Sequence, residues 1–152
     1  MKKVTVVISA FPACGKSFAY NNYQDKYNIL DSDSSKFDKR YFPDNYIEHI
    51  KDNLGKADII FVSSHQNVRD ALTDNDIDYV TVYPELDCKD EWLFRMQKRG
   101  SPENFIQSQD ENWNDRVKNV IPHGHKLYRL HHNQFITLDL LDKIVDFMRD
   151  IL

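Results

Sequence analysis

Residues 9–17 read Ser9-Ala10-Phe11-Pro12-Ala13-Cys14-Gly15-Lys16-Ser17, and they directly follow the apolar, β-branched run from Val4 to Ile8. A continuously apolar run of this kind is typical of a strand that is covered on both faces of a sheet. Residues 17–24 can continue as a helix. The segment therefore predicts a tight connection between a buried strand and a helix near the start of the chain.

The composition of this connection favours the binding of phosphate groups. Gly15 lets the backbone approach an anion closely, Lys16 can reach the β- and γ-phosphates of a nucleotide, and the Ser17 hydroxyl can ligate Mg²⁺. The phosphate-binding motif is G-x-x-x-x-G-K-[ST], and this chain has Ala10 at the position of the first glycine. Alanine can replace glycine there if its φ stays negative. The alternative is a structural turn with a chance Gly-Lys-Ser. We predict that bound ATP or another nucleoside triphosphate contacts Ala13, Cys14, Gly15, Lys16, Ser17 and Phe18.

Strand and helix patterns alternate along the rest of the chain. Further strands are predicted at 27–30, 58–63, 79–83 and 126–130, and further helices at 43–54, 66–73, 87–97, 101–117 and 141–148. This alternation indicates an α/β fold with a mostly parallel sheet.

Composition narrows the class of protein. The 152 residues fit a single domain, 1–152, and 41% hydrophobic residues are enough for a packed core. A net charge of −4 argues against a surface that coats nucleic acid. We see no apolar run long enough for a membrane span or a secretory signal, so we expect a cytoplasmic protein.

The loop, the chain length and the order of the elements resemble the P-loop nucleoside and nucleotide kinases, in particular short phage-type deoxynucleoside monophosphate kinases. The resemblance implies a three-layer α/β fold with a five-stranded sheet in the order 2-3-1-4-5 and helices on both faces. It also implies ATP and Mg²⁺ as cofactors, an acceptor region after the second strand, and an arginine-bearing helical lid after the fourth. We place that lid at approximately residues 95–118.

Arg95 and Arg99 are the candidate lid arginines. They lie four residues apart near the end of a predicted helix, so they share one face. Positive charge around the moving phosphoryl group is the main requirement of this chemistry. The alternative is a surface row of ion pairs that begins at Glu91. Arg116 and Lys118 are weaker candidates.

Asp31 and Asp33 follow the second predicted strand, at the carboxyl edge where open α/β sheets bind ligands. Either carboxylate can hold Mg²⁺ through water or take the proton of an attacking hydroxyl. The alternative is a solvated turn in which the Asp side chain caps the backbone. The third predicted strand does not end in the acidic residue of a Walker B motif. We therefore assign Mg²⁺ to Ser17 together with Asp31 or Asp33.

Side chains near the same edge are candidates for the acceptor. His65 and Arg69 lie four residues apart after the third strand, and Arg40 follows the second. The rings of Phe37, Tyr41, Phe42 and Tyr46 can stack on a base or simply pack in the core.

The histidines and cysteines do not predict a metal centre. Cys14 and Cys88 lack ligand spacing, and the His123-Gly124-His125 and His131-His132 groups have no acidic or cysteine partners at ligand spacing in the sequence. We therefore expect a loop and a strand end at those positions.

Three functions follow from these residues. The first is transfer of the γ-phosphoryl group of ATP to a nucleoside monophosphate, with Asp33, Arg40, His65 and Arg69 near this small-molecule acceptor. The second transfers it to a hydroxyl group of a nucleoside, a sugar, a modified base or a nucleic-acid end, the last being not favoured, with Asp31 or Asp33 as base. The third is a module that binds nucleotide without turnover. The sequence predicts no oligomeric state.

Overall fold

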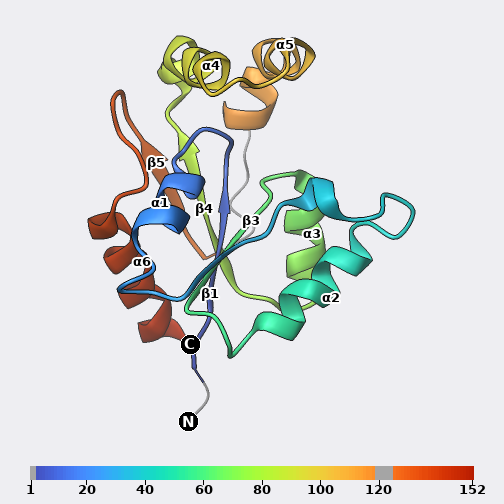
Figure 1. Ribbon diagram of the computed structural model, residues 1–152, viewed down its shortest axis with the longest axis vertical. Coiled ribbons are helices and arrows are strands. Elements are labelled where there is room, and N and C mark those ends of the chain that lie inside the picture. Colours follow the sequence, from blue (N-terminus) through green and yellow to red (C-terminus); the bar gives the residue numbers. More distant parts are fainter. Residues whose placement is uncertain (1–2, 119–124) are drawn as a thin grey trace.

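The computed structural model describes residues 3–118 and 125–152. Five parallel strands form one sheet in the order β2-β3-β1-β4-β5 (Figure 1). The strands are β1 (Val6–Ala10), β2 (Ile29–Asp31), β3 (Ile59–Val62), β4 (Tyr79–Pro84) and β5 (Leu127–Leu130). This order confirms the predicted α/β fold class.

Helices cover both faces of the sheet, which gives three layers. The helices α2 (Asp44–Asn53) and α3 (Gln66–Asp74) lie on one face, and α1 (Lys16–Asn22) and α6 (Leu138–Ile151) lie on the other (Figure 1). Successive side chains of a strand point to opposite faces. Val7 accordingly packs in the cluster that contains the α2 and α3 side chains, whereas Val6 and Ile8 pack in the cluster that contains those of α6.

The first strand extends further toward the loop than its apolar run predicts. Ser9 and Ala10 are fully buried and pair with β3 and β4, respectively. The Ser9 hydroxyl donates a hydrogen bond to the Ser63 carbonyl at 3.0 Å, so its polar group is satisfied inside the sheet. The first position of the loop motif is therefore the last residue of β1.

Beyond the carboxyl ends of the strands lie α4 (Lys89–Lys98), α5 (Glu103–Glu111) and a π-helical turn, η3 (Asn114–Lys118) (Figure 1). The predicted continuous helix 101–117 is wrong, because α5 ends at Glu111 and Asn112 caps it. Trp113 is buried, and its indole N–H donates to the Leu86 carbonyl at 2.9 Å. Its ring also meets Phe11 edge-on at 5.7 Å, so the chain turns inward there and anchors this segment to the loop after β1.

The helices of the described residues are too short or too polar for a membrane span.

Candidate active site

The loop between β1 and α1 forms a tight turn that is fixed by its neighbours. The Phe11 amide donates to the Val82 carbonyl at 2.9 Å, and the Cys14 carbonyl accepts from the Ile136 amide at 2.8 Å. Gly15 has a φ of 104°, which strains any other residue, and a Cβ there would lie close to the Ile136 nitrogen, at 3.3 Å. The β4 strand and the residues before α6 thus hold the loop in place.

The alanines of the loop differ in conformation. Ala10 lies in β1, and any residue can adopt the extended backbone of a strand. Alanine can therefore occupy this position of the motif in place of glycine. Ala13 does adopt the left-handed region, with φ at 64°, which L-residues other than glycine rarely occupy. The Ala13 carbonyl is held by Arg95, whose Nη1 donates to it at 3.1 Å.

Lys16 is half-buried at the start of α1. Burial lowers the pKa of its ammonium group, and the Asp31 carboxylate opposes that shift. A phosphate group beside Lys16 would stabilise the charged form in the same way. The site is therefore electrostatically suited to an anion.

Two cavities flank Lys16. One, of about 900 Å³, lies between the loop, α4 and the residues before α6, and the other, of about 500 Å³, lies over the ends of β2 and β3 and beside α5. Lys16, Ser17 and Arg99 line both cavities. A group that passes from one cavity to the other would therefore pass these three side chains.

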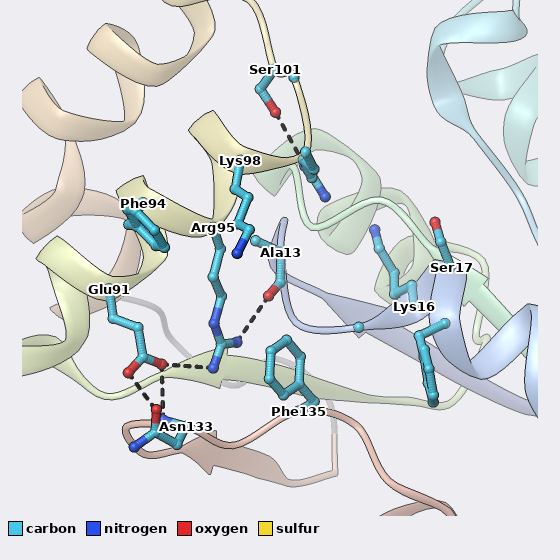
Figure 2. Close-up of a pocket in the computed structure, with 14 residues that line it drawn as sticks. Ala13, Lys16, Ser17, Glu91, Phe94, Arg95, Lys98, Ser101, Asn133 and Phe135 are labelled. Atoms are coloured by element: carbon cyan, nitrogen blue, oxygen red, sulfur yellow. Dashed lines mark hydrogen bonds and ion pairs between the residues drawn. The ribbon is translucent and has the colours of Figure 1, made fainter.

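Arg95 and Arg99, which the sequence presents as a pair, are held in different ways. Figure 2 shows the Arg95 guanidinium between Glu91 and the Ala13 carbonyl. Its Nη2 lies 2.6 Å from a Glu91 carboxylate oxygen and 2.7 Å from the Gln134 carbonyl oxygen. The ring centroids of Trp92 and Phe135 lie 3.7 and 3.8 Å from its Cζ.

Arg99 is much less constrained. Its Nε donates a hydrogen bond to the Ser101 hydroxyl at 3.1 Å, and the side chain is exposed between the two cavities. Desolvation lowers the pKa of its guanidinium. Of the two arginines, Arg99 is the one that lines both cavities.

The two aspartates after the second strand also differ. Asp31 ends β2 half-buried, and burial raises the pKa of its carboxyl group while Lys16 opposes that rise. Asp33 is exposed, and it accepts hydrogen bonds from the Ser35 hydroxyl at 2.7 Å and the Ser35 amide at 2.9 Å, which lower its pKa. Asp33 thus caps the short helix η1 (Ser34–Lys36), although both carboxyl groups line the smaller cavity.

The remaining loop residues have distinct positions. Ser17 and Phe18 are exposed, with Phe18 in the wall of the larger cavity. Cys14 is buried under the loop, and burial raises the pKa of its thiol to about 12. Only the backbone of Cys14 can therefore face a ligand.

The smaller cavity brings His65 and Arg69 together, as their spacing predicts. Arg69 is buried, its Nε donates to the Ser64 carbonyl at 3.1 Å, and its Cζ lies 5.9 Å from the Tyr83 ring. Desolvation, with Arg116 and Lys16 nearby, lowers the pKa of His65 and favours its neutral form. Arg116 reaches the same cavity from η3.

Arg40 and the rings that follow β2 lie elsewhere. Arg40 is exposed and ion-paired with Asp38 at 2.8 Å, outside the walls of both cavities. Tyr46 is fully buried, its hydroxyl donates to the Ser32 carbonyl at 2.7 Å, and Phe37 packs against it edge-on. Phe37, Phe42 and Tyr46 pack in the core and Tyr41 is exposed, whereas Phe11, Tyr83 and Phe105 line the smaller cavity.

Several residues of the two cavities escaped the sequence analysis. The larger one includes Asn133 and Phe135, and the smaller one includes Gln109 and Asn112. Gln109 is only 5% exposed, and its Oε1 has no hydrogen-bond partner among the described residues 3–118 and 125–152. A buried amide without a partner is unusual and suggests that a ligand supplies one.

Comparison with known proteins adds to this geometry. No family model matches the sequence, and no curated protein does. Among solved structures, the chain is similar to a gluconokinase from Sinorhizobium meliloti 1021, with a TM-score of 0.57 at 15% identity. The superposition covers 99% of this chain and 94% of that one.

This chain has the P-loop kinase fold. The similarity spans nearly all of both chains and agrees with the strand order found here. At 15% identity it shows the fold alone. The chemistry must be argued from the residues of this chain.

Proposed function

We propose that the protein is an ATP-dependent phosphotransferase that acts on a nucleoside monophosphate. The observation that supports this is the junction of the two cavities at Lys16, Ser17 and Arg99. In the proposal, ATP occupies the larger cavity with its phosphates in the loop, and the acceptor occupies the smaller one. The two reactants then meet beside the three shared side chains, which gives the proximity that the reaction requires.

The donor side uses the loop amides and Lys16 to hold the β- and γ-phosphates, while Arg99 neutralises charge on the moving group. The Ser17 hydroxyl and the Asp31 carboxylate line the same cavity, and such oxygen donors suit Mg²⁺. When bound there, Mg²⁺ would neutralise charge on the nucleotide phosphates. We assign residues 95–118 to a lid over this site.

The acceptor side has the charge that a monophosphate needs. Arg69 and Arg116 supply cations, and the rings of Phe11, Tyr83 and Phe105 offer apolar surface to a base. An oxygen of the acceptor phosphate attacks the γ-phosphorus of ATP, and the bond to the β–γ bridging oxygen breaks. ADP leaves and a nucleoside diphosphate forms, with no general base required because the acceptor phosphate is already ionised.

A hydroxyl acceptor is the second candidate, and Asp31 is the observation that favours it. This half-buried carboxyl group has a raised pKa, as a general base near the reaction centre often has. Such a mechanism loses rate as the pH falls through the pKa of Asp31, which lies above the usual value of about 3.9 for aspartate.

Asp31→Asn separates these two candidates. With a monophosphate acceptor and saturating Mg²⁺, we expect kcat to change by less than about 10-fold, since no proton has to be removed. Asp33→Asn is the matched control, because the new amide can still cap η1. Steady-state kinetics measures both variants. A loss on the order of 10²–10⁴-fold in Asp31→Asn alone, measured with a hydroxyl acceptor such as a nucleoside, would favour the second candidate.

Gln109→Leu tests the acceptor cavity. We expect KM for the acceptor to rise about 10-fold or more with KM for ATP unchanged, because the amide no longer bonds the acceptor. Protein stability should stay the same or rise, since leucine leaves no buried polar atom unpaired. Gln107→Leu is the control on the exposed side of the same helix. Equal acceptor KM values in the two variants would remove Gln109 from the proposed binding site.

A further inference from the structure

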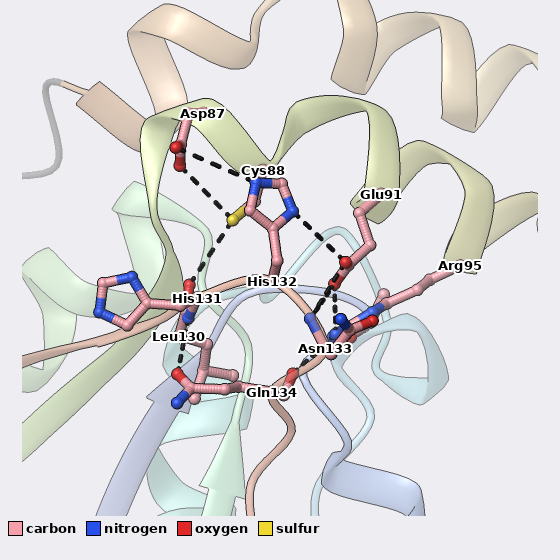
Figure 3. A network of polar contacts seen from close by, with 10 residues as sticks. Asp87, Cys88, Glu91, Arg95, Leu130, His131, His132, Asn133 and Gln134 are labelled. Carbon is pink, nitrogen blue, oxygen red and sulfur yellow. Dashed lines mark hydrogen bonds and ion pairs between the residues drawn. The ribbon is translucent and has the colours of Figure 1, made fainter.

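A second group of chemically reactive side chains lies outside both cavities, where β4 and β5 end. Asp87 and Cys88 belong to the short helix η2 (Leu86–Cys88), and His132 lies in the turn after β5. Pro84 pairs with Leu130 in the parallel ladder, so residues that follow these two positions emerge at the same edge of the sheet. Figure 3 shows the three side chains facing one another.

The spacing of the three ligand atoms approaches that of a metal centre. Cys88 Sγ lies 3.6 Å from Asp87 Oδ1, and His132 Nε2 lies 4.0 Å from Asp87 Oδ2. One sulfur, one nitrogen and one oxygen all lie within 4.8 Å of one another. Bonds of about 2.0–2.3 Å in a tetrahedral zinc centre place ligand atoms roughly 3.3–3.8 Å apart, so small side-chain rotations are enough.

The histidine ring is already oriented by a carboxylate on its other side. His132 Nδ1 lies 3.4 Å from Glu91 Oε1, which leaves Nε2 toward Asp87 and Cys88 (Figure 3). Glu91 is itself fixed by the Asn133 amide, at 2.9 Å, and by Arg95, at 2.6 Å. Metal-bound histidines commonly have such a carboxylate on the second ring nitrogen, because it sets the tautomer and the orientation of the ring.

We propose that Asp87, Cys88 and His132 form a binding site for Zn²⁺ or a similar borderline-soft divalent cation, with water as the fourth ligand. A thiolate and an imidazole select such ions over Mg²⁺ and Ca²⁺, which prefer oxygen ligands. Cys88 releases its thiol proton to solvent when the ion binds. The ion would connect η2 to the turn after β5. This proposal does not depend on the proposed phosphotransfer.

The strand end expected at His131-His132 is confirmed, because β5 ends at Leu130, but the sequence spacing gave no sign of acidic or cysteine partners there. Those partners exist, but they precede His132 by more than forty residues in the sequence and meet it only through the pairing of β4 with β5. His131 takes a different direction, with its Nε2 3.8 Å from Glu85. The other predicted exclusion, at residues 123–125, falls partly outside the described residues.

Titration of the full chain with Co²⁺ tests the proposal, because Co²⁺ replaces Zn²⁺ and gives a thiolate-to-metal charge-transfer band. We expect one bound equivalent with that band, and displacement of Co²⁺ by Zn²⁺. Cys88→Ser should abolish the band, and His132→Ala, an exposed position, should weaken affinity at least about 10-fold. Calorimetry with Zn²⁺ alone gives the affinities.

Two neighbouring variants serve as matched controls. Cys14→Ser removes the other cysteine, and His131→Ala removes the adjacent histidine, and both should retain the band and the affinity. Circular dichroism reports whether each variant is folded. The proposal is overturned if the folded wild type gives no charge-transfer band, if the band survives Cys88→Ser, or if His131→Ala and His132→Ala lose affinity equally.

Discussion

Replacing Lys16 with alanine is expected to reduce phosphoryl transfer on the order of 10³-fold or more, because this side chain is shared by both cavities and can contact the β- and γ-phosphates. The loss should appear in kcat with every acceptor, since the interaction is with the donor and the moving group. Turnover that remains unchanged in this variant would refute the proposed function as a whole.

The stability of Lys16 variants separates a catalytic role from a structural one. Burial lowers the pKa of Lys16 in the folded state, so keeping the side chain protonated near neutral pH opposes folding. Lys16→Met retains the apolar stem without the charge, and its melting temperature should equal or exceed that of the wild type. Melting curves near neutral pH measure this. A clear fall in melting temperature would indicate that the activity loss follows from unfolding.

Arg99→Ala should lower kcat on the order of 10³-fold with little change in melting temperature, because an arginine that meets the transferred group acts mainly on the transition state. Within residues 3–118 and 125–152, its side chain has one hydrogen-bond partner to lose, the Ser101 hydroxyl. Arg99→Lys keeps the charge but loses the planar fork, so it should restore only part of the rate.

Arg95→Ala is the matched comparison, and we expect it to lower stability more than kcat. Its guanidinium joins Glu91 to the carbonyls of Ala13 and Gln134, so its removal should lower the free energy of unfolding by about 2 kcal/mol or more. That corresponds to a melting temperature lower by roughly 4–8 °C for a chain of this size. Equal effects of the two variants on kcat and on stability would contradict the distinct roles.

Sequence patterns predicted the fold well because the strands of a parallel sheet are buried on both faces. The apolar runs around Ile8, Phe61 and Val82 stand out from the polar segments between them, and the alternation with helices leaves few possible topologies. The end of the helix predicted at 101–117 was harder to predict, because the helical spacing of apolar residues continues beyond the last residue of α5. Trp113 turns the chain inward by its contacts with Leu86 and Phe11, which are remote in sequence.

The candidate site divides in the same way. The loop around Lys16 is a local sequence motif, so it could be predicted directly, although β4 and the residues before α6 hold it in place. The different settings of Arg95 and Arg99 could not, because Arg95 is held by residues near 13 and 134 that a helical pattern does not include. Asp31 and Asp33 are likewise equivalent in the sequence, and they differ only in the folded chain, where Asp31 is half-buried and Asp33 is hydrogen-bonded to Ser35.

No sequence pattern marked Gln109 or Phe135 as residues of the site. A glutamine on a helix and a phenylalanine in a polar turn are both common, and their position in the cavity walls results from packing of the segments beyond the sheet. The three proposed ligands of the divalent cation escaped for the same reason, since strand pairing brings together residues that the sequence separates.

The measurement that tests the central proposal most directly is transfer from ATP labelled in its γ-phosphate. The wild-type protein and Lys16→Ala are incubated side by side with Mg²⁺ and each nucleoside monophosphate, each nucleoside and a 5′-hydroxyl oligonucleotide. We predict that label appears in the diphosphate of at least one nucleoside monophosphate with the wild type, and in no product with Lys16→Ala. Binding of ATP by the wild type without transfer to any acceptor, or equal transfer by both proteins, would contradict the proposal.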